Sequence, residues 1–352
     1  MSSVTVLVES RALRISLPSV TRRLVGRRVS IFLGRPVDWS TAIAIHLKKA
    51  GDIAANNGNA TIISRCTRHL VPCDVLYSWF KRALCNGHGN VIRLLLDLPA
   101  CKGMSPGTFN STALIQASGN GYSNIVSMLL NLPEVYQISP SAYNNEALIK
   151  AFTNSHEYVL RLLLELPLSR GVDPSVCGNI ILLKAAMRGN DRIVRLLINL
   201  PLSRGVDPSS SHNDAILQAS INGHEKVVRL LLDIELDRGV DPSAENNEAL
   251  RWASGNGHEA VVRLLLDLPL SRGVDPSALN NTALRWASSS GHEGIVTLLM
   301  DLPLSRGVDP GSEHNGAMQM ACQNGHLSVV RLLTIHMQFR DVNEQYFKKS
   351  LT

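Results

Sequence analysis

The chain has 352 residues, of which 45% are hydrophobic and only 5% aromatic, and its formal net charge is +6. This length allows a large buried interior, the scarcity of aromatic residues suits a fold built from Ala, Val and Leu, and no run approaches the roughly 18 apolar residues of a membrane-spanning helix. Residues 1–72 hold 11 Lys plus Arg against 3 Asp plus Glu, a balance of +8, whereas residues 73–352 hold 24 against 26, or −2. The charge of residues 73–352 therefore gives no indication of nucleic-acid binding.

Residues 1–37 are a basic leader in which Arg residues are interleaved with Ser, Val and Leu, and Glu9 is the single acid. We expect a poorly ordered leader. The same composition is found in organelle transit peptides, and a basic segment can also bind nucleic acid or another anionic surface, so both alternatives stay open.

Residues 38–75 precede the regular part of the chain. Residues 41–50 predict a helix, and Ala50-Gly51-Asp52 resembles a turn of the later repeats, although it is out of register with them. We interpret the segment as a degenerate repeat or an N-terminal cap, which a stack of repeats needs to cover its first apolar face.

Residues 76–333 repeat with a period of 34 residues, which is anchored on the pair Gly257-His258. A string RGVDP recurs with the same step, beginning at Arg170, Arg204, Arg238, Arg272 and Arg306. Steps of 34 from His258 reach His88, Tyr122, His156, Asn190, His224, His292 and His326. A fixed period of this length indicates stacked repeats rather than a domain with one central core.

Each repeat predicts two short helices. In residues 246–278, Ala249, Leu250 and Ala253 have helical spacing, and a second stripe predicts a helix from about residue 258 to residue 268. Gly257 separates the two helices and Pro269 ends the second. The second stripe consists of Val261, Val262, Leu264, Leu265 and Leu268.

The residue before each first helix is predicted to be its N-cap, whose side-chain oxygen accepts from a free N–H of the first turn. The residues in this column are Ser111, Asn145, Asn179, Asn213, Asn247, Asn281 and Asn315.

The pattern A-L-x-x-A-S-x-x-G-H-x-x-V-V-x-L-L-L, read from Ala249 onward, resembles the ankyrin repeat, with about eight repeats between Trp79 and Leu333. The resemblance implies an all-α solenoid in which an inner helix, a Gly-His turn and an outer helix alternate. The family's Thr-Pro-Leu-His opening is replaced here by Glu248-Ala249-Leu250-Arg251, and the period is one residue longer than the usual 33. The connections are therefore expected to be loops or short β-hairpins. A tetratricopeptide array shares the 34-residue period, but its Trp, Gly, Tyr and Pro pattern is not found.

Residues 334–352 depart from the repeat and become charged, which indicates a C-terminal cap or tail. The histidines that recur every 34 residues are too far apart for one ion, since neighbouring helices lie roughly 8–10 Å apart, so we predict a local polar role in the turn. Cys66, His69 and Cys73 have only weak zinc spacing; no metal, cofactor or catalytic residue is predicted. The recurring Arg of the second helices, as at Arg263, is expected to pair with an acid four residues later, such as Asp267.

Two adjacent positions of the inner helix change from repeat to repeat. The first reads Lys81, Ile115, Ile149, Leu183, Leu217, Arg251, Arg285 and Gln319, and the second reads Arg82, Gln116, Lys150, Lys184, Gln218, Trp252, Trp286 and Met320. Positions that hold the repeats together are expected to carry the same residue in every repeat, whereas positions that contact another molecule are free to vary. Ankyrin proteins bind partners with inner helices and loop tips, so the resemblance places a partner site here. The alternative is that the two Trp residues fill the core.

We therefore predict a non-catalytic scaffold that needs no cofactor, is monomeric, lies in the cytoplasm or nucleus, and binds another protein. The alternative functions are nucleic-acid or anionic-surface binding through the basic leader, and the alternative location is an organelle. The predicted partner-binding residues are Lys150, Lys184, Glu245, Arg251, Trp252, Leu279, Arg285, Trp286, Glu313 and Gln319.

Overall fold

The computed structural model describes residues 39–69, 71–98, 107–133, 136, 138–234 and 239–350. Within these ranges the chain forms 18 α-helices joined by short loops and 3₁₀ turns, and no β-strand. No helix in this part of the chain is long and apolar enough to cross a membrane. The basic leader, with its targeting and anionic-surface alternatives, lies outside the described residues.

The chain divides into two compact units, the first of which comprises residues 1–117 and 122–138. Trp79 is fully buried, and its ring lies directly against Gly51, where any side chain would collide with it. Gly51 lies inside the helix that spans Trp39–Asn56. The interpretation of Ala50-Gly51-Asp52 as a repeat turn was therefore wrong. The helices of this unit are α3 (Trp39–Asn56), α4 (Ala60–Cys66), α5 (Cys73–Cys85), α6 (Gly89–Leu96), most of α8 (Gly107–Gly119) and α9 (Ser123–Leu130).

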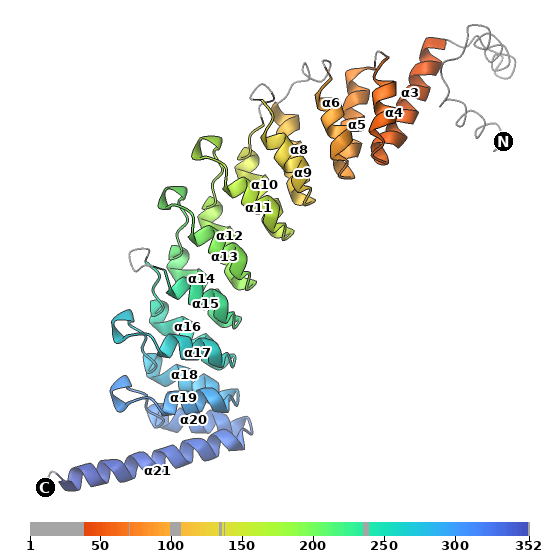
Figure 1. The fold of residues 1–352 in the computed structure, drawn as a ribbon. Helices are drawn as coiled ribbons and strands as arrows, with labels where there is room; N and C mark the ends of the chain where they lie inside the picture. Colours follow the sequence, from red (N-terminus) through yellow and green to blue (C-terminus); the bar gives the residue numbers. More distant parts are fainter. Residues whose placement is uncertain are drawn as a thin grey trace. The chain divides into compact units, whose positions relative to one another are not determined.

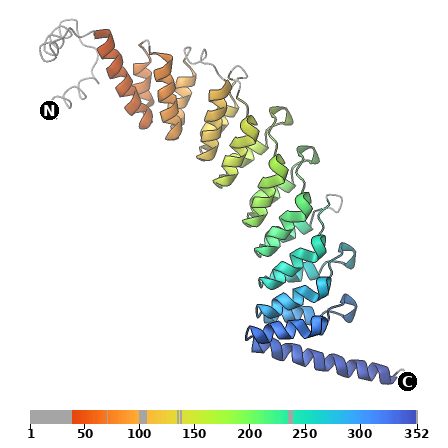
Figure 2. The same ribbon diagram turned by 180° about the vertical axis from the view of Figure 1, so that it is seen from behind.

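The second unit comprises residues 118–121 and 139–352, and it contains the most regular repeats. Its inner helices pack side by side in one row and its outer helices in a second row, each helix against its neighbours in sequence (Figures 1 and 2). The inner helices are α10 (Ala142–Thr153), α12 (Val176–Met187), α14 (Ser210–Ile221), α16 (Ala244–Gly255), α18 (Ala278–Ser289) and α20 (Ser312–Gln323). The outer helices are α11 (Glu157–Leu164), α13 (Asp191–Ile198), α15 (Glu225–Leu232), α17 (Glu259–Leu266), α19 (Glu293–Met300) and α21 (Leu327–Ser350).

The core of each repeat lies between its two helices and those of the neighbouring repeats. Ala249, Leu250 and Ala253 of α16 are buried, as the sequence predicts. In α17 the buried residues are Val261, Val262, Leu265 and Leu266, whereas Leu264 and Leu268 are half-buried. Helices of 8 and 12 residues are too short to be stable alone, since isolated helices below roughly 12–15 residues are marginal, so the burial between neighbours holds them.

The connections between repeats are loops. After α17, a 3₁₀ turn (Leu270–Arg272) leads to Gly273, which has φ 73° and faces the Ser243 side chain of the preceding loop. Val274 is buried, and three residues with left-handed backbone then precede the right-handed part of α18. The described loops after α11, α13, α17 and α19 project on one side of the second unit (Figure 1). Of the two predicted kinds of connection, the loop is therefore the correct one among the described residues.

Helix α21 is 24 residues long, three times the length of the preceding outer helix, α19. The departure from the repeat after residue 333 thus leaves the helix intact. The division of the chain into a leader, an N-terminal cap, an array and a C-terminal cap stays a prediction.

Candidate partner-binding surface

The two variable positions of each inner helix lie on a surface that we call the inner-helix face. In the second unit it consists of Ile149, Lys150, Leu183, Lys184, Leu217, Gln218, Arg251, Trp252, Arg285, Trp286, Gln319 and Met320, all of which are exposed or half-buried. The face therefore extends along the whole row from α10 to α20, and it does not belong to the core.

Two indole rings stand next to each other on this face. Trp252 is 38% exposed, and its ring centroid lies 4.9 Å from that of Trp286 with an angle of 57° between the planes. The Nε1–H of Trp252 donates to Glu248 Oε1 at 3.1 Å. The exposure of Trp252 argues against the core-filling alternative, and its contacts hold the ring in one orientation.

Arg251 and Gln319 each support the loop that precedes their own helix. Arg251 Nε donates to the carbonyl of Asn246 and Nη2 to that of Glu245, both at 3.0 Å, while its guanidinium carbon lies 5.7 Å from the Trp286 ring centroid. Gln319 Nε2 donates to the carbonyl of His314 at 2.8 Å. These two predicted partner-binding residues therefore have a structural role as well.

Arg285 is half-buried and its Nη2 donates to Thr282 Oγ1 at 3.2 Å. The methylene groups of Arg285 lie against Gly316 of the next inner helix. Arg285 therefore contributes less accessible charge to the face than its position in the sequence predicts.

The opposite end of the face is basic. Lys150 pairs with Glu146, four residues earlier, with Nζ and Oε1 3.5 Å apart. Lys184 has Ile180 at the equivalent earlier position, and it forms no ion pair with any described side chain. One turn later, the guanidinium of the exposed Arg188 lies 5.2 Å from the ring centroid of Phe152. Arg188, which we did not predict, could have been found by extending the column of Lys184 by one helical turn.

The tips of the loops have an unusual backbone. In each loop from α10 to α20 three consecutive residues have positive φ; at Glu245, Asn246 and Asn247 the values are 51°, 56° and 61°. A left-handed helical backbone costs roughly 1–2 kcal/mol per residue with a side chain. The second and third residues are Asn, His or Gly, which tolerate this region best, while the first varies and is exposed. The first residues are Tyr143, Cys177, Ser211, Glu245, Leu279 and Glu313.

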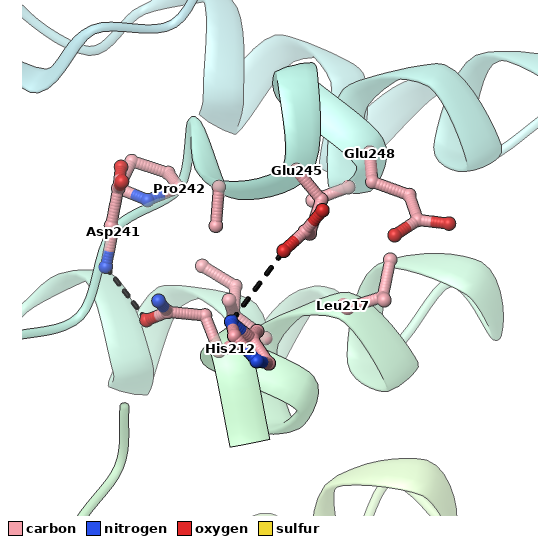
Figure 3. A pocket seen from close by; sticks show the side chains of 10 residues that line it. His212, Leu217, Asp241, Pro242, Glu245 and Glu248 are labelled. Carbon is pink, nitrogen blue, oxygen red and sulfur yellow. Dashed lines mark hydrogen bonds and ion pairs between the residues drawn. The ribbon is translucent and has the colours of Figure 1, made fainter. Parts of the chain in front are cut away.

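The three predicted tip residues lie at the loop tips, and two of them contact side chains of neighbouring loops. Glu245 Oε1 lies 3.5 Å from His212 Nδ1 across a shallow groove between α14 and α16 (Figure 3). Glu313 accepts from the Asn280 amide, and Leu279 is half-exposed. Apolar residues and polar or charged residues line the groove in equal number, and we assign no ligand to it.

The expectation that the recurring Asn caps its own helix was wrong. Asn247 is buried, and its Oδ1 accepts from the backbone N–H of Asp275 in the next loop at 2.8 Å. The Asp275 carboxylate in turn accepts from the N–H of Ser277 at 2.8 Å. The same long-range bond joins Asn145 to Asp173, Asn179 to Asp207, Asn213 to Asp241 and Asn281 to Asp309.

The Arg of the RGVDP string also bonds the preceding repeat. Arg204 is buried, and its guanidinium donates to the carbonyls of Leu166 and Val172 at 2.8 and 3.2 Å. Arg272 likewise donates to the carbonyls of Leu232 and Val240, and Arg306 to those of Leu266 and Val274. We call these Arg residues and the Asn–Asp pairs the stitching residues. The sequence predicts only a turn at this string.

The recurring His also acts between repeats rather than within its own turn. The Nε2–H of His258 donates to the carbonyl of Ile221 at 2.9 Å, and its ring covers Gly223 of the preceding turn. His224 and His292 donate in the same way to Met187 and Gly255. The interpretation as a turn residue was right, but the polar contact is not local.

The outer helices show a second correction. Arg263 Nη2 pairs with Glu259 Oε1 at 2.7 Å and Arg229 with Glu225 at 2.9 Å, so the acid lies four residues before the Arg rather than after it. The side chains of all four residues are about half exposed. Such pairs contribute about 0.2–0.5 kcal/mol each and form no anion site.

The described residues contain no group of three His, Cys, Asp or Glu side chains that could hold a metal ion. Cys66, proposed as a weak zinc candidate, is buried, and this burial raises the pKa of its thiol above the ordinary value. Neither observation adds chemistry to the inner-helix face.

A comparison with protein families finds a match that covers more than half of the chain. The family model described as ankyrin repeats (3 copies) matches residues 80–176, 166–246 and 234–313. No curated protein matches the chain. The serial helix pairs and this match lead to one conclusion: the chain belongs to the ankyrin repeat family.

Proposed function

We propose that this protein is a non-catalytic scaffold that binds another protein through the inner-helix face and the adjoining loop tips. Ankyrin repeats generally mediate protein–protein interaction. The observation that supports the site is the exposed Trp252, whose ring packs tilted against Trp286 and whose N–H is already bonded. Aromatic and Arg residues are over-represented among the residues that dominate binding energy, and a ring that is already oriented loses little entropy on binding.

The surface that the proposal uses is separate from the recurring hydrogen bonds that join neighbouring repeats. The stitching residues and the His–carbonyl bonds lie between neighbouring repeats, while Lys184 and Trp252 are exposed. A partner can therefore occupy the inner-helix face without disrupting the stack. A monomeric state and a cytoplasmic or nuclear location stay predictions.

Affinity capture with the full-length protein, followed by mass spectrometry, tests the proposal. We expect Trp252→Ala to lose a partner that the wild type retains. The matched control is Tyr158→Ala, which removes an aromatic ring that is 64% exposed on the outer helix α11 and should leave capture unchanged. A partner retained equally by both variants, or lost only by the Tyr158 variant, would contradict the site.

Arg251→Ala together with Arg285→Ala is predicted to weaken capture as well. Because Arg251 also bonds the carbonyls of Glu245 and Asn246, this double variant changes the loop as well as the surface. The Trp252 variant is therefore the sharper test, and circular dichroism of each variant provides the control for folding.

A further inference from the structure

The inner-helix face has two chemically different ends, two repeats apart. Lys184 on α12 and Arg188, the residue that caps its C-terminal end, are exposed cations without an ion pair to any described side chain. On α16 and α18, Trp252 and Trp286 form an aromatic pair. Between them α14 contributes the uncharged Gln218. This order of chemistry restricts what can lie along the face.

The aromatic end favours an uncharged apolar side chain. The faces of indole rings attract cations, but the Arg251 guanidinium already lies 5.7 Å from the Trp286 ring centroid, and Arg285 is on the same helix as Trp286. The Glu248 carboxylate offsets one of these charges and is bonded to Trp252. A second cation would meet a net positive surface, whereas an aliphatic, aromatic or Pro side chain would remove apolar ring surface from water.

The basic end favours carboxylates. In α10, α14 and α16 an acid, Glu146, Asp214 or Glu248, lies four residues before the exposed column. At that position α12 has the apolar Ile180. Lys184 therefore has no acid four residues earlier on its own helix, whereas Lys150 forms an ion pair with Glu146 at that spacing. Unpaired Lys and Arg side chains at the surface attract acidic groups and give a binding rate that depends on salt.

The spacing sets the length of the partner. Neighbouring helices pack roughly 8–10 Å apart, so the two steps from α12 to α16 span roughly 16–20 Å, which an extended peptide at about 3.3 Å per residue crosses in five or six residues. We propose that the face binds an extended acidic segment of another protein, with carboxylates at Lys184 and Arg188 and an apolar side chain about five or six residues away on Trp252 and Trp286. This inference rests on the proposed function and specifies its partner.

The test is a selection from a phage library of random peptides about twelve residues long, enough to cover both ends, with the full-length protein as bait. We expect the selected peptides to share an Asp/Glu cluster separated by about five or six residues from an aliphatic, aromatic or Pro residue. The affinity of a selected peptide should fall about tenfold or more in Lys184→Glu and in Trp252→Ala, and it should weaken with added NaCl.

Three controls separate binding from folding. Lys226→Glu makes the same charge change at an exposed position of the outer helix α15 and should leave affinity unchanged. Tyr158→Ala is the aromatic control. Trp252→Phe keeps a ring and should retain most of the affinity if Trp252→Ala loses binding rather than the fold.

The outcomes distinguish the inference from the proposed function. Three results would overturn the proposal of an acidic partner: selected peptides without an excess of acids, peptides whose affinity falls in Trp252→Ala but not in Lys184→Glu, or a selection that yields no binder. The proposed function would then still be tested by the capture experiment. Peptides that are insensitive to every variant of the face would count against both.

Discussion

The stitching residues and the inner-helix face occur in the same repeats of the second unit, but they behave differently from one repeat to the next. The Asn–Asp pair is identical in five successive loops, from Asn145–Asp173 to Asn281–Asp309. The exposed column of the face changes from Lys150 through Gln218 to Trp252 and Met320. The stack requires the first set in every repeat, because each pair joins one loop to the next. The face can differ because its side chains are exposed or half-buried and its contacts between repeats, such as the Trp252–Trp286 pair, do not recur in every repeat.

The largest expected effect comes from the shared core. Leu265→Ala removes a fully buried side chain of α17 and should lower the free energy of unfolding by about 2–5 kcal/mol, measured by urea denaturation. The control Leu270→Ala, at a position that is 73% exposed, should change it by less than about 0.5 kcal/mol. Equal stability of the two variants would mean that the outer helix is not buried.

The second test separates the contribution of an Asn–Asp hydrogen bond from the cost of the left-handed backbone at the same Asn. Asn247→Ala leaves the N–H of Asp275 without its acceptor. The control is the same substitution at Asn315, in the last loop, where the backbone is also left-handed, with φ 65°, but the residue is exposed. The cost of the left-handed backbone is common to both variants. We therefore expect Asn247→Ala to be more destabilising by about 1–3 kcal/mol in thermal or urea unfolding, the cost of an unmade buried hydrogen bond. If both variants lose the same free energy of unfolding, the hydrogen bond between Asn247 and Asp275 does not contribute to stability.

The Arg of the RGVDP string should show a similar or smaller effect. Arg204→Gln loses two bonds to backbone carbonyls in a buried site and should cost about 1–3 kcal/mol of unfolding free energy. Arg192→Gln removes an exposed Arg that pairs with Glu157 at 3.8 Å, and it should cost less than about 0.5 kcal/mol. If both substitutions cost the same, Arg204 is an ordinary surface charge.

The smallest effect is expected on the outer helices. Glu259→Gln breaks the exposed pair with Arg263 and should lower stability by about 0.2–0.5 kcal/mol at low salt. The difference from the wild type should shrink further in about 0.5 M NaCl, because salt screens exposed charges. An effect that is independent of salt would show that Glu259 acts through something other than its charge.

The helices could be predicted from the sequence because their signals are local. Ala249, Leu250 and Ala253 repeat at helical spacing, Gly257 interrupts the pattern and Pro269 follows it, so the type and order of the helices follow without any long-range information. The bounds of α17, Glu259–Leu266, differ from the predicted ones by one residue at the start and two at the end.

The stitches could not be predicted in the same way. An Asn before a helix is a common N-cap, and nothing in its immediate neighbours shows that Asn247 bonds a residue 28 positions later. The available signals were the constant step between the Asn and Asp columns, and the Asn, His or Gly pairs at the loop tips, which tolerate a left-handed backbone. The variable positions of the face were recognisable, but the bracing contacts of Arg251 and Gln319 require the folded loop.

Hydrogen–deuterium exchange of the full-length protein, with and without a captured partner, tests the central claim most directly. We expect protection on binding within residues 176–187, 244–255 and 278–289 and the loop tips beside them, and no change in the outer helices α13, α15 and α17. Protection confined to the outer helices, or absent from residues 244–255, would contradict the assignment of the inner-helix face as the binding surface.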